Sequence, residues 1–183
     1  VIMPVRNEEL FVSRSLGAML NQDYPHSRYE ILLIDGMSTD RTRALVNDLA
    51  EKSDVEVRII DNPGRTVPPA MNIGIEAAAG EIIMRMDGHT EAPADYLTQC
   101  VATLKQTGAD NVGGVVRYVG RDAFSRAAGL AAQSKFGCGG APARSAQEGL
   151  VHTVSFGCWR REKFERFGVF DEQVVRTQHS EFN

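Results

Sequence analysis

The segment Gly80-Glu81-Ile82-Ile83-Met84-Arg85-Met86-Asp87-Gly88-His89-Thr90 carries the most informative pattern in the chain. It runs from a glycine into a short, mostly apolar segment of strand length and stops at an acid, a glycine and a histidine. This pattern predicts a buried strand that delivers polar side chains at its carboxyl end. Ligands of open parallel α/β sheets bind beyond the carboxyl ends of the strands, so Asp87 and His89 could hold a metal and a phosphate there. A surface turn after a buried strand is the alternative, because short acidic turns are common.

Three earlier segments read as strands, and a helical pattern follows each of them. The strands are expected at Val1–Val5, Tyr29–Ile34 and Val55–Ile60. Apolar stripes and a proline pair predict the helices, which contain Val12, Leu16, Met19 and Leu20, then Leu45, Val46 and Leu49, then Pro68 to Ala77, closing at Gly80. This alternation of strand and helix predicts a mostly parallel sheet with right-handed crossovers.

Polar residues follow the first two strands directly. Asn7 and Glu8 come after the first strand and Asp35 after the second, so both strands deliver polar groups to one edge of the sheet. Asn7 is placed to cap the next helix, and a ligand contact is the equal alternative. In the third helix, Asn72 and Gly74 lower the helix propensity, which indicates a close approach to another backbone or to a ligand.

The second half of the chain has a different texture. We expect helices at Tyr96–Gln106, Phe124–Lys135 and Arg160–Phe167, and strands at Asn111–Tyr118, interrupted by two glycines, and at Leu150–Phe156. The glycine-rich loop 136–142 is either a lid over a bound phosphate or a linker. Its glycines match neither the dinucleotide-binding spacing nor the Walker spacing.

Length and composition bound the class of protein. The 183 residues suffice for one domain with a real core, and a net charge of −4 gives no electrostatic footprint for nucleic acid or an anionic membrane. Three irregularly spaced cysteines predict reduced, packed thiols and a cytoplasmic setting. No apolar run is long enough to span a bilayer, and no signal peptide is visible. We expect the chain to be a fragment of a longer polypeptide, whose other parts could supply membrane association.

Six segments, taken in order and spacing, resemble the family 2 glycosyltransferases with the GT-A fold. They cover nearly the whole chain: Pro4–Glu8, Ile34–Asp40, Asn62–Gly74, Met86–His89, Phe156–Arg161 and Gly168–Glu172. Within that family the likeness is to bacterial enzymes of succinoglycan-type exopolysaccharide synthesis. The resemblance implies one α/β domain over residues 1–183, with a Rossmann-like, mostly parallel central sheet and helices on both faces. Residues 1–95 would bind the nucleotide sugar and residues 96–183 the acceptor.

The resemblance also implies a donor site and a metal site. Asp35 matches the aspartate that reads the nucleotide base, usually uracil, and Asp87 matches the first acid of the Asp-x-Asp motif, beside ribose and diphosphate. His89 stands where the metal-binding second acid usually is, as in the polypeptide N-acetylgalactosaminyltransferases, and imidazole is a good ligand for Mn²⁺. The expected cofactor is Mn²⁺ or Mg²⁺. The nucleotide-sugar contacts implied in this way are Pro4, Val5, Asn7, Glu8, Asp35, Asn72 and Asp87.

The catalytic base implied by the resemblance departs from the family pattern. Many members carry an acidic pair after the Phe-Asp-Glu turn, where this chain has Gln178 and His179. His179 could take the proton of an acceptor hydroxyl, and Glu181 is the alternative base. Both could instead be frayed terminal residues.

Three residues near position 160 are candidates for the acceptor side. Trp159 could stack on a sugar ring or belong to the core. Arg160 and Arg161 could steer the acceptor or the diphosphate, or form a solvated helix face.

The function implied by the resemblance is inverting sugar transfer in polysaccharide biosynthesis. The resemblance implies a nucleoside-diphosphate sugar as donor, with UDP as the expected nucleotide. The acceptor would be a saccharide or a lipid-linked saccharide, reached at the inner face of the membrane. A sugar nucleotidyltransferase is one alternative, although no lysine-containing glycine-rich loop follows the first strand. A nucleotide-sugar-binding domain without transferase activity is the other. An oxidoreductase is disfavoured, because no Gly-x-Gly-x-x-Gly follows any strand.

Overall fold

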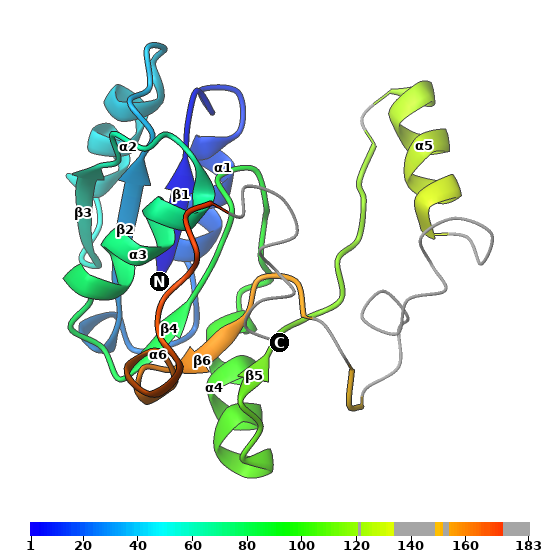
Figure 1. Cartoon of the computed structure of the whole chain (residues 1–183). Helices are drawn as coiled ribbons and strands as arrows, with labels where there is room; N and C mark the ends of the chain where they lie inside the picture. The colour runs from blue at the N-terminus through cyan, green and yellow to red at the C-terminus, as the bar shows by residue number, and fades with distance from the viewer. Residues whose placement is uncertain (121, 134–148, 152–153, 174–183) are drawn as a thin grey trace.

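A twisted, mixed sheet forms the centre of the computed structural model, which describes residues 1–120, 122–133, 149–151 and 154–173 (Figure 1). Three parallel strands pair in the order β1-β2-β3: β1 (Ile2–Val5), β2 (Glu30–Asp35) and β3 (Glu56–Asp61). Three antiparallel strands pair in the order β4-β6-β5: β4 (Ile82–Met84), β6 (Cys158–Arg160) and β5 (Asn111–Val112). A parallel bridge between Ile2 and Arg85 joins the two groups, so β4 lies beside β1.

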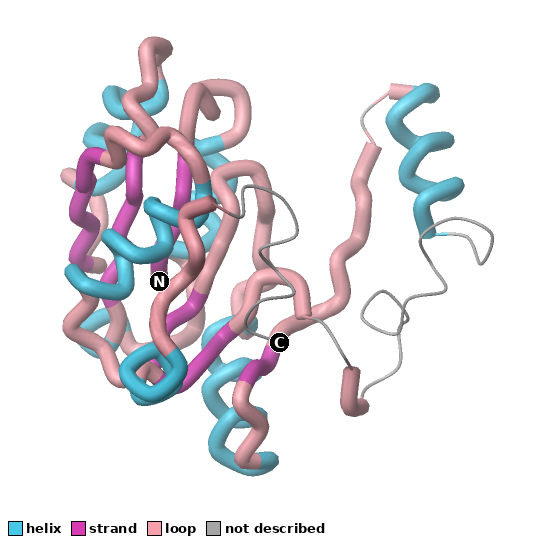
Figure 2. Tube along the Cα trace, in the orientation of Figure 1, coloured by secondary structure: helices cyan, strands magenta, loops and turns pink. Residues whose placement is uncertain are grey.

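Helices cover both faces of this sheet (Figure 2). One apolar cluster joins β2 to α1 (Val12–Leu20), α2 (Thr42–Ala50) and α4 (Tyr96–Thr107). A second cluster, on the opposite face, joins β1 and β2 to α3 (Val67–Ala77) and α6 (Glu162–Phe167). Helix α5 (Ala123–Gln133) stands apart from the sheet, and a short 3-10 helix spans His26–Arg28. The predicted α/β fold is therefore confirmed. The neighbouring strands β3, β2, β1 and β4 all run parallel.

The strand pattern explains why β2 is the most apolar strand. It is central among the parallel strands, and Ile31, Leu32, Leu33 and Ile34 are all fully buried, alternating between the two apolar clusters. β3 lies at the edge, and its side chains are only partly covered. A strand that is buried on both faces reads as a continuous apolar run, which is how it was predicted.

Several local predictions are wrong in the second half of the chain. Among the described residues the last strand is Cys158–Arg160, and the described part of 150–156 forms no strand. α6 accordingly begins at Glu162 rather than Arg160. β5 ends at Val112 and not at Tyr118. At Gly113 the backbone passes against the side chain of Val154 and leaves no room for a Cβ atom. In the first half, α3 ends at Ala77 rather than Gly80. The glycine-rich loop 136–142 lies outside the described residues.

Two of the predicted packed thiols can be checked. Cys100 and Cys158 are free and buried, which confirms that prediction for both, whereas Cys138 lies outside the described residues. Burial raises the pKa of Cys100 to about 11 and that of Cys158 to about 12. Both thiols are therefore neutral and unreactive near neutral pH.

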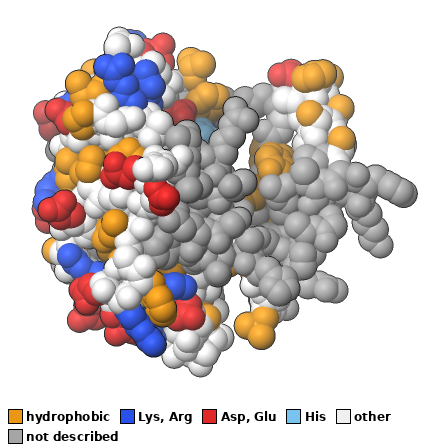
Figure 3. Space-filling model, in the orientation of Figure 1, with side chains coloured by type: hydrophobic (Ala, Val, Ile, Leu, Met, Phe, Trp, Pro, Cys, Tyr) orange, Lys and Arg blue, Asp and Glu red, His pale blue; other side chains and the backbone are white. Residues whose placement is uncertain are grey.

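The described surface has mixed charge on the face in Figure 3, and the described helices are short or polar. Basic and acidic side chains are interspersed on the face shown in Figure 3, with no broad patch of one sign over its described part. Among the described residues, no helix has the length and apolar character needed to cross a membrane.

Candidate active site

The carboxyl ends of the parallel strands are level, as the sequence pattern required. In the register of the sheet, Val5 lies beside Asp35, and Asp35 lies beside Asp61. The segment after β4 reaches the same edge, because Met86 donates its backbone N–H to the carbonyl of Ile2 at 2.9 Å. Four loops therefore meet at one edge of the sheet.

Three of these loops contain a non-glycine residue with a left-handed backbone. Asn7 after β1 has φ 54°, Met37 after β2 has φ 60°, and Arg65 after β3 has φ 59°. Each such conformation costs roughly 1–2 kcal/mol for an ordinary L-residue, and less for asparagine. Phe156, before β6, is the fourth such residue in the described part of the chain. Backbone strain of this kind concentrates at binding and catalytic sites, so three strained residues in these loops indicate a functional role for this edge.

A cavity of about 180 Å³ opens at this edge. It is smaller than the roughly 300 Å³ at which pockets for drug-sized ligands begin, so it can enclose only part of a nucleotide sugar. It brings together five of the predicted donor and metal residues, namely Pro4, Val5, Glu8, Asp87 and His89. The other lining residues are Arg6, Ile34, Gly36, Asn62, Arg65, Thr66, Val67 and Ala70.

Asn62, in the wall of this cavity, holds an unused hydrogen-bond acceptor. Its side chain is 1% exposed, and its Nδ2 atom donates to the carbonyl of Thr66 at 2.9 Å. That contact fixes the orientation of the amide, since only nitrogen can donate. Its Oδ1 atom is buried and has no hydrogen-bond partner among the described residues. A buried acceptor without a partner costs about 1–3 kcal/mol, which a ligand N–H or O–H group would recover.

The Asp-x-His segment is held in place by partners from other elements. Arg85, buried in the sheet, donates Nε to Asp87 Oδ1 at 2.8 Å. His89 Nδ1 lies 2.9 Å from Glu8 Oε1. Between them, the carbonyl of Gly88 accepts a hydrogen bond of 2.6 Å from Ser15 Oγ on α1. The two predicted metal ligands are thus on one loop, but each is bonded to a different neighbour.

Asp87 and His89 suit a divalent metal as a partial donor set. A carboxylate oxygen and an imidazole nitrogen are acceptable ligands for Mn²⁺ and, less well, for Mg²⁺. The second carboxylate oxygen of Asp87 makes no hydrogen bond with the described residues. Within that part of the chain no group of three or more His, Cys, Asp or Glu side chains could enclose a metal. The remaining ligands would therefore have to come from a substrate phosphate and water.

Asp35 has a different environment from the one expected of a base-reading aspartate. Its side chain is fully buried, and its Oδ2 atom accepts from Arg43 Nη1 at 2.9 Å and from the backbone N–H of Ser38 at 3.1 Å. Arg43 also bonds Asp61 Oδ1 at 2.5 Å, so it bridges β2 and β3. Asp35 lies under the loop 36–39, not on the cavity surface, and a nucleotide base would reach it only if that loop moved.

Asn7 does not cap α1, so that prediction is wrong. The helix begins after Phe11, and no side chain caps it. Asn7 instead ties two loops together, since its Oδ1 atom accepts from the backbone N–H of Thr39 at 2.9 Å and its own N–H donates to Ser38 Oγ at 2.9 Å. Asn7 therefore shapes the edge without lining the cavity.

Asn72 also has both ends of its amide engaged. Nδ2 donates to the carbonyl of Phe170 at 2.9 Å and to Glu172 Oε1 at 3.0 Å, while Oδ1 accepts from the N–H of Phe170 at 2.9 Å. These bonds fasten the segment after α6 to α3. Asn72 does not line the cavity, and its predicted contact with the nucleotide sugar finds no support in this geometry.

The acceptor-side prediction finds no support either, because β6 runs antiparallel to β4. Arg160 pairs with Ile82 at the start of β4, which places it and Arg161 at the edge opposite the cavity. Arg160 donates to the carbonyl of Leu104 at 3.4 Å, and Arg161 donates to the carbonyl of Ala78.

Trp159 belongs to the core. It is 4% exposed and packs edge-on against Phe164 and Phe170, with ring centroids 5.7 Å and 6.4 Å away. The core alternative was thus the correct one, and stacking on a sugar is excluded for this position.

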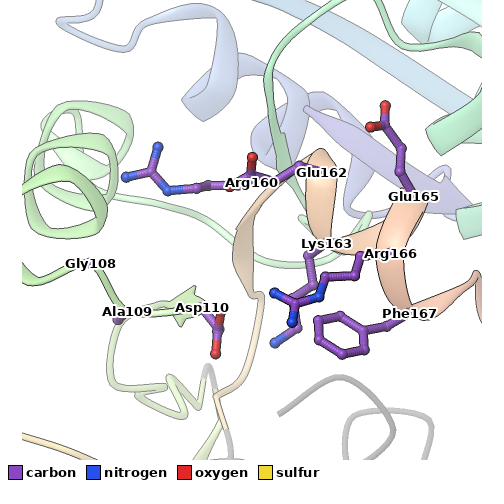
Figure 4. A pocket seen from close by; sticks show the side chains of 9 residues that line it. All are labelled: Gly108, Ala109, Asp110, Arg160, Glu162, Lys163, Glu165, Arg166 and Phe167. Carbon is purple, nitrogen blue, oxygen red and sulfur yellow. The ribbon is translucent and has the colours of Figure 1, made fainter.

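A second cavity, of about 470 Å³, lies at that opposite edge (Figure 4). It is lined by both signs of charge, with Arg160, Lys163 and Arg166 near Asp110, Glu162 and Glu165. None of the four edge loops reaches it. It therefore has no part in the site described here.

Some relevant residues were not singled out from the sequence, and others fall outside the described structure. Arg65, Arg43 and Arg85 were missed; a signal existed only for Arg85, a charge between Met84 and Met86 in a buried strand. His179 and Glu181, the candidate bases, lie outside the described residues, so their role stays a prediction.

The chain is similar to glycosyltransferases and to a protein of polysaccharide biosynthesis. Residues 1–168 match the model of the glycosyl transferase family 2. The whole chain aligns at 31% identity with 56% of the succinoglycan biosynthesis protein ExoA of Rhizobium meliloti. It also aligns at 29% identity with 59% of a dolichyl N-acetyl-alpha-D-glucosaminyl phosphate 3-beta-D-2,3-diacetamido-2,3-dideoxy-beta-D-glucuronosyltransferase of Methanococcus voltae. The chain thus spans somewhat more than half the length of these relatives.

Solved structures share the fold. The mannosyltransferase PcManGT of Pyrobaculum calidifontis, in complex with GDP-Man and Mn²⁺, superposes on 97% of the chain with a TM-score of 0.71 and 24% identity, and 49% of its own chain is covered. S. aureus TarS 1-349 in complex with UDP superposes on 99% of the chain with a TM-score of 0.70 and 15% identity, and 52% of its own chain is covered. At these identities the likeness establishes the GT-A fold and no more.

Proposed function

Because the chain belongs to glycosyl transferase family 2, we propose that it carries the donor site of an inverting transferase that uses a nucleoside-diphosphate sugar. The acceptor would be a saccharide or a lipid-linked saccharide in polysaccharide biosynthesis. Both relatives named above build glycans, as their names state, and the name of one includes a dolichyl phosphate. The dolichyl-linked relative favours an acceptor at a membrane surface, and we place the reaction on the cytoplasmic side.

The observation that carries this proposal is the cavity at the carboxyl edge with the unpaired Asn62 Oδ1 in its wall. Nucleotide bases and riboses offer the N–H and O–H groups that such an acceptor needs. UDP is the favoured nucleotide, since uracil presents an N–H group and TarS, a GT-A neighbour, binds UDP. Asp35 remains the proposed base contact, reached when the loop 36–39 shifts.

The diphosphate would lie across the mouth of the cavity. Arg6 and Arg65 line it and supply positive charge, and the N-terminus of α3 points the same way, which favours an anion. Proline at the start of α3 removes backbone donors, so the two arginines carry more of the contact than a helix end alone would.

Asp87 and His89 would hold a divalent metal between the protein and the diphosphate. When bound, Mn²⁺ or Mg²⁺ would neutralise the charge that develops on the departing diphosphate. The chain's own residues supply the rest: Arg85 orients Asp87, and Pro4 and Val5 contribute apolar surface to the cavity wall. The base that deprotonates the acceptor hydroxyl would be His179 or Glu181.

The two alternative functions are weaker. A sugar nucleotidyltransferase needs a lysine-bearing loop for a triphosphate after the first strand, and the segment after β1 is Arg6-Asn7-Glu8-Glu9. A binding domain without transferase activity would share the donor site, and only a reaction separates it from an enzyme.

The test is calorimetric titration of UDP into the chain with and without Mn²⁺, repeated on His89→Ala and on His26→Ala. His26 is the matched control, because it also bonds a carboxylate, Asp54 at 2.6 Å, but lies outside the edge loops. We expect Mn²⁺ to strengthen UDP binding in the unchanged chain and in His26→Ala, and to have no effect in His89→Ala. UDP binding that ignores both the metal and the histidine would refute the metal site.

A second measurement separates the enzyme from the binding domain. Release of free sugar from UDP-sugars by the unchanged chain is expected of a transferase, in which water replaces the acceptor. Binding of UDP without any such release, and without transfer to saccharides, would favour the binding domain.

A further inference from the structure

The carboxylate of Glu8 is rigidly placed although it lies on a loop. Its backbone N–H donates to Thr42 Oγ1 at 2.8 Å, and Thr42 is fully buried on α2. Its carbonyl accepts from the N–H groups of Phe11 and Val12 at 2.9 and 2.8 Å, where α1 begins. The side chain is 19% exposed. Both sides of the Glu8 backbone are therefore fixed before the side chain meets any partner.

The loop that carries His89 is docked on the same place. Ser15 Oγ holds the carbonyl of Gly88, and a Cβ atom at position 88 would lie 2.7 Å from Val5 Cγ1 and 3.2 Å from Glu8 Cγ. Only glycine permits this approach. The contact between His89 Nδ1 and Glu8 Oε1, at 2.9 Å, thus joins two fixed loops that are 81 positions apart in the chain.

This contact determines which imidazole nitrogen is available. An ionised carboxylate can only accept a hydrogen bond, so Nδ1 of His89 must carry the proton. A neutral imidazole has one N–H, which leaves the lone pair on Nε2. A metal binds the nitrogen with the lone pair, and a carboxylate on the other nitrogen fixes the ring and makes it a stronger ligand.

We propose that Glu8 is a positioning residue that holds His89 in the Nδ1–H tautomer and so presents Nε2 to the divalent metal of the donor site. The proposal rests on the proposed function, since it concerns the same metal. An Asp-x-His motif has one negative charge fewer than Asp-x-Asp. In this proposal Glu8 supplies that charge through its contact with Nδ1 of His89. Glu8 therefore acts through His89 and need not touch the nucleotide.

Glu9 provides a matched control for charge and location. It is the next residue, and its carboxylate accepts from the backbone N–H of Arg41 at 3.1 Å instead of meeting His89. Glu8→Gln provides a second comparison, because an amide oxygen can still accept from Nδ1–H but carries no charge. The set is Glu8→Ala, Glu8→Gln, Glu9→Ala and His89→Ala.

The first readout is the tautomer of His89, from the ¹⁵N shifts of its ring at a pH above 8 and without metal, assigned by their loss in His89→Ala. We expect Nδ1–H in the unchanged chain, in Glu9→Ala and in Glu8→Gln. In Glu8→Ala we expect the Nε2–H form to become prominent. An Nε2–H ring in the unchanged chain, or an unaltered tautomer in Glu8→Ala, would overturn the proposal.

The second readout is Mn²⁺ affinity in the presence of saturating UDP, from the electron paramagnetic resonance signal of free Mn²⁺. Loss of an outer carboxylate weakens metal binding by about 10- to 100-fold, which we expect for Glu8→Ala. Glu8→Gln should lose less, and Glu9→Ala should bind as the unchanged chain does. Equal Mn²⁺ affinity in Glu8→Ala and the unchanged chain would overturn the proposal.

These readouts distinguish the proposal from the proposed function. If His89→Ala binds Mn²⁺ as the unchanged chain does, the metal site itself is wrong and the proposal falls with it. If His89→Ala loses Mn²⁺ and Glu8→Ala does not, the metal site stands and only the role of Glu8 is refuted. Should Glu8→Ala fail to fold, two measurements still test the proposal: the tautomer of His89 in the unchanged chain and the Mn²⁺ affinity of Glu8→Gln.

Discussion

Two glycines inside helices give opposite predictions for the same substitution. Gly74 in α3 faces Ile2, which is 1% exposed, and a Cβ atom at position 74 would lie 2.6, 2.8 and 2.9 Å from three carbon atoms of that side chain. Gly17 in α1 has nothing within 4 Å of the same position. Real Cβ atoms are essentially never found closer than 3.0 Å to another atom, so only Gly74→Ala forces the core to move.

The magnitudes follow from two opposing effects. Alanine is favoured over glycine inside a helix by about 1 kcal/mol, a gain that both substitutions share. Overpacking a well-filled core costs about 1–3 kcal/mol, and only Gly74→Ala incurs it. Since three atoms of a buried side chain are involved, we place Gly74→Ala at a net loss of about 1–2 kcal/mol. Gly17→Ala should gain about 1 kcal/mol.

Thermal unfolding followed by circular dichroism measures both changes. For a domain of this size, 1 kcal/mol corresponds to a shift in Tm of about 2–4 °C. Gly17→Ala should therefore raise Tm and Gly74→Ala should lower it. Ile2→Ala removes all three clashing atoms, so in a double-mutant cycle it should couple favourably with Gly74→Ala by about 1 kcal/mol or more.

Two results would refute this reasoning. One is a Tm for Gly74→Ala that rises as much as that of Gly17→Ala; the other is a cycle in which Ile2→Ala and Gly74→Ala are additive. A third result would change the interpretation of Gly74. If the double variant Ile2→Ala, Gly74→Ala regains stability but not UDP binding, Gly74 is needed for ligand binding as well as for packing of the core.

Three further predictions concern the anchor, the far edge and the thiols. Asn72→Ala removes three hydrogen bonds to the segment after α6, so urea unfolding should show a loss of about 1–3 kcal/mol. Thr107→Ala at the end of α4 should lose less, because the two hydrogen bonds of its hydroxyl are exposed to solvent. Arg160→Ala should leave UDP affinity unaltered, and a weakened affinity would contradict the placement of β6. The pKa values of Cys100 and Cys158 are raised by burial from 9.0 to about 11 and about 12, so above pH 9 the unfolded thiols ionise while the folded ones do not. The free energy of unfolding should therefore be unaffected by these groups below pH 9 and fall between pH 9 and 11 by about 1.4 kcal/mol per pH unit for each thiol, with a shallower slope in Cys158→Ala.

The sequence predicted most of the sheet because the pattern of apolar residues along a strand depends on which of its faces are buried. β2 is apolar from Ile31 to Ile34, since it is covered on both faces, and Asp35 could be placed at its carboxyl end from that run alone. The final strand was misplaced for the converse reason. Cys158-Trp159-Arg160 is only three residues long, too short for a periodic pattern to mark it as a strand.

The candidate site was predicted at the right edge but with the wrong partners. The level ends of parallel strands follow from topology, so Glu8, Asp87 and His89 could be brought together from the sequence. Pair contacts do not follow from topology. Arg43 bridges Asp35 and Asp61 from a helix, and no spacing in the sequence links these three residues.

Polar residues at this edge fall into two kinds that the sequence cannot distinguish. Asn72 has both ends of its amide bonded within the protein and anchors the segment after α6, and Asn7 joins two loops through its Oδ1 atom. Asn62 has the same side chain and lies in the same motif region, yet its oxygen is buried without a partner. Since a folded chain seldom leaves a buried acceptor unpaired, the position with the missing bond is the one where a ligand is expected. Asn62→Asp should consequently weaken UDP binding, because an aspartate cannot donate to the carbonyl of Thr66 and adds a negative charge to a cavity that is proposed to bind an anion. Asn7→Asp keeps the acceptor that Thr39 requires and should bind UDP much as the unchanged chain does.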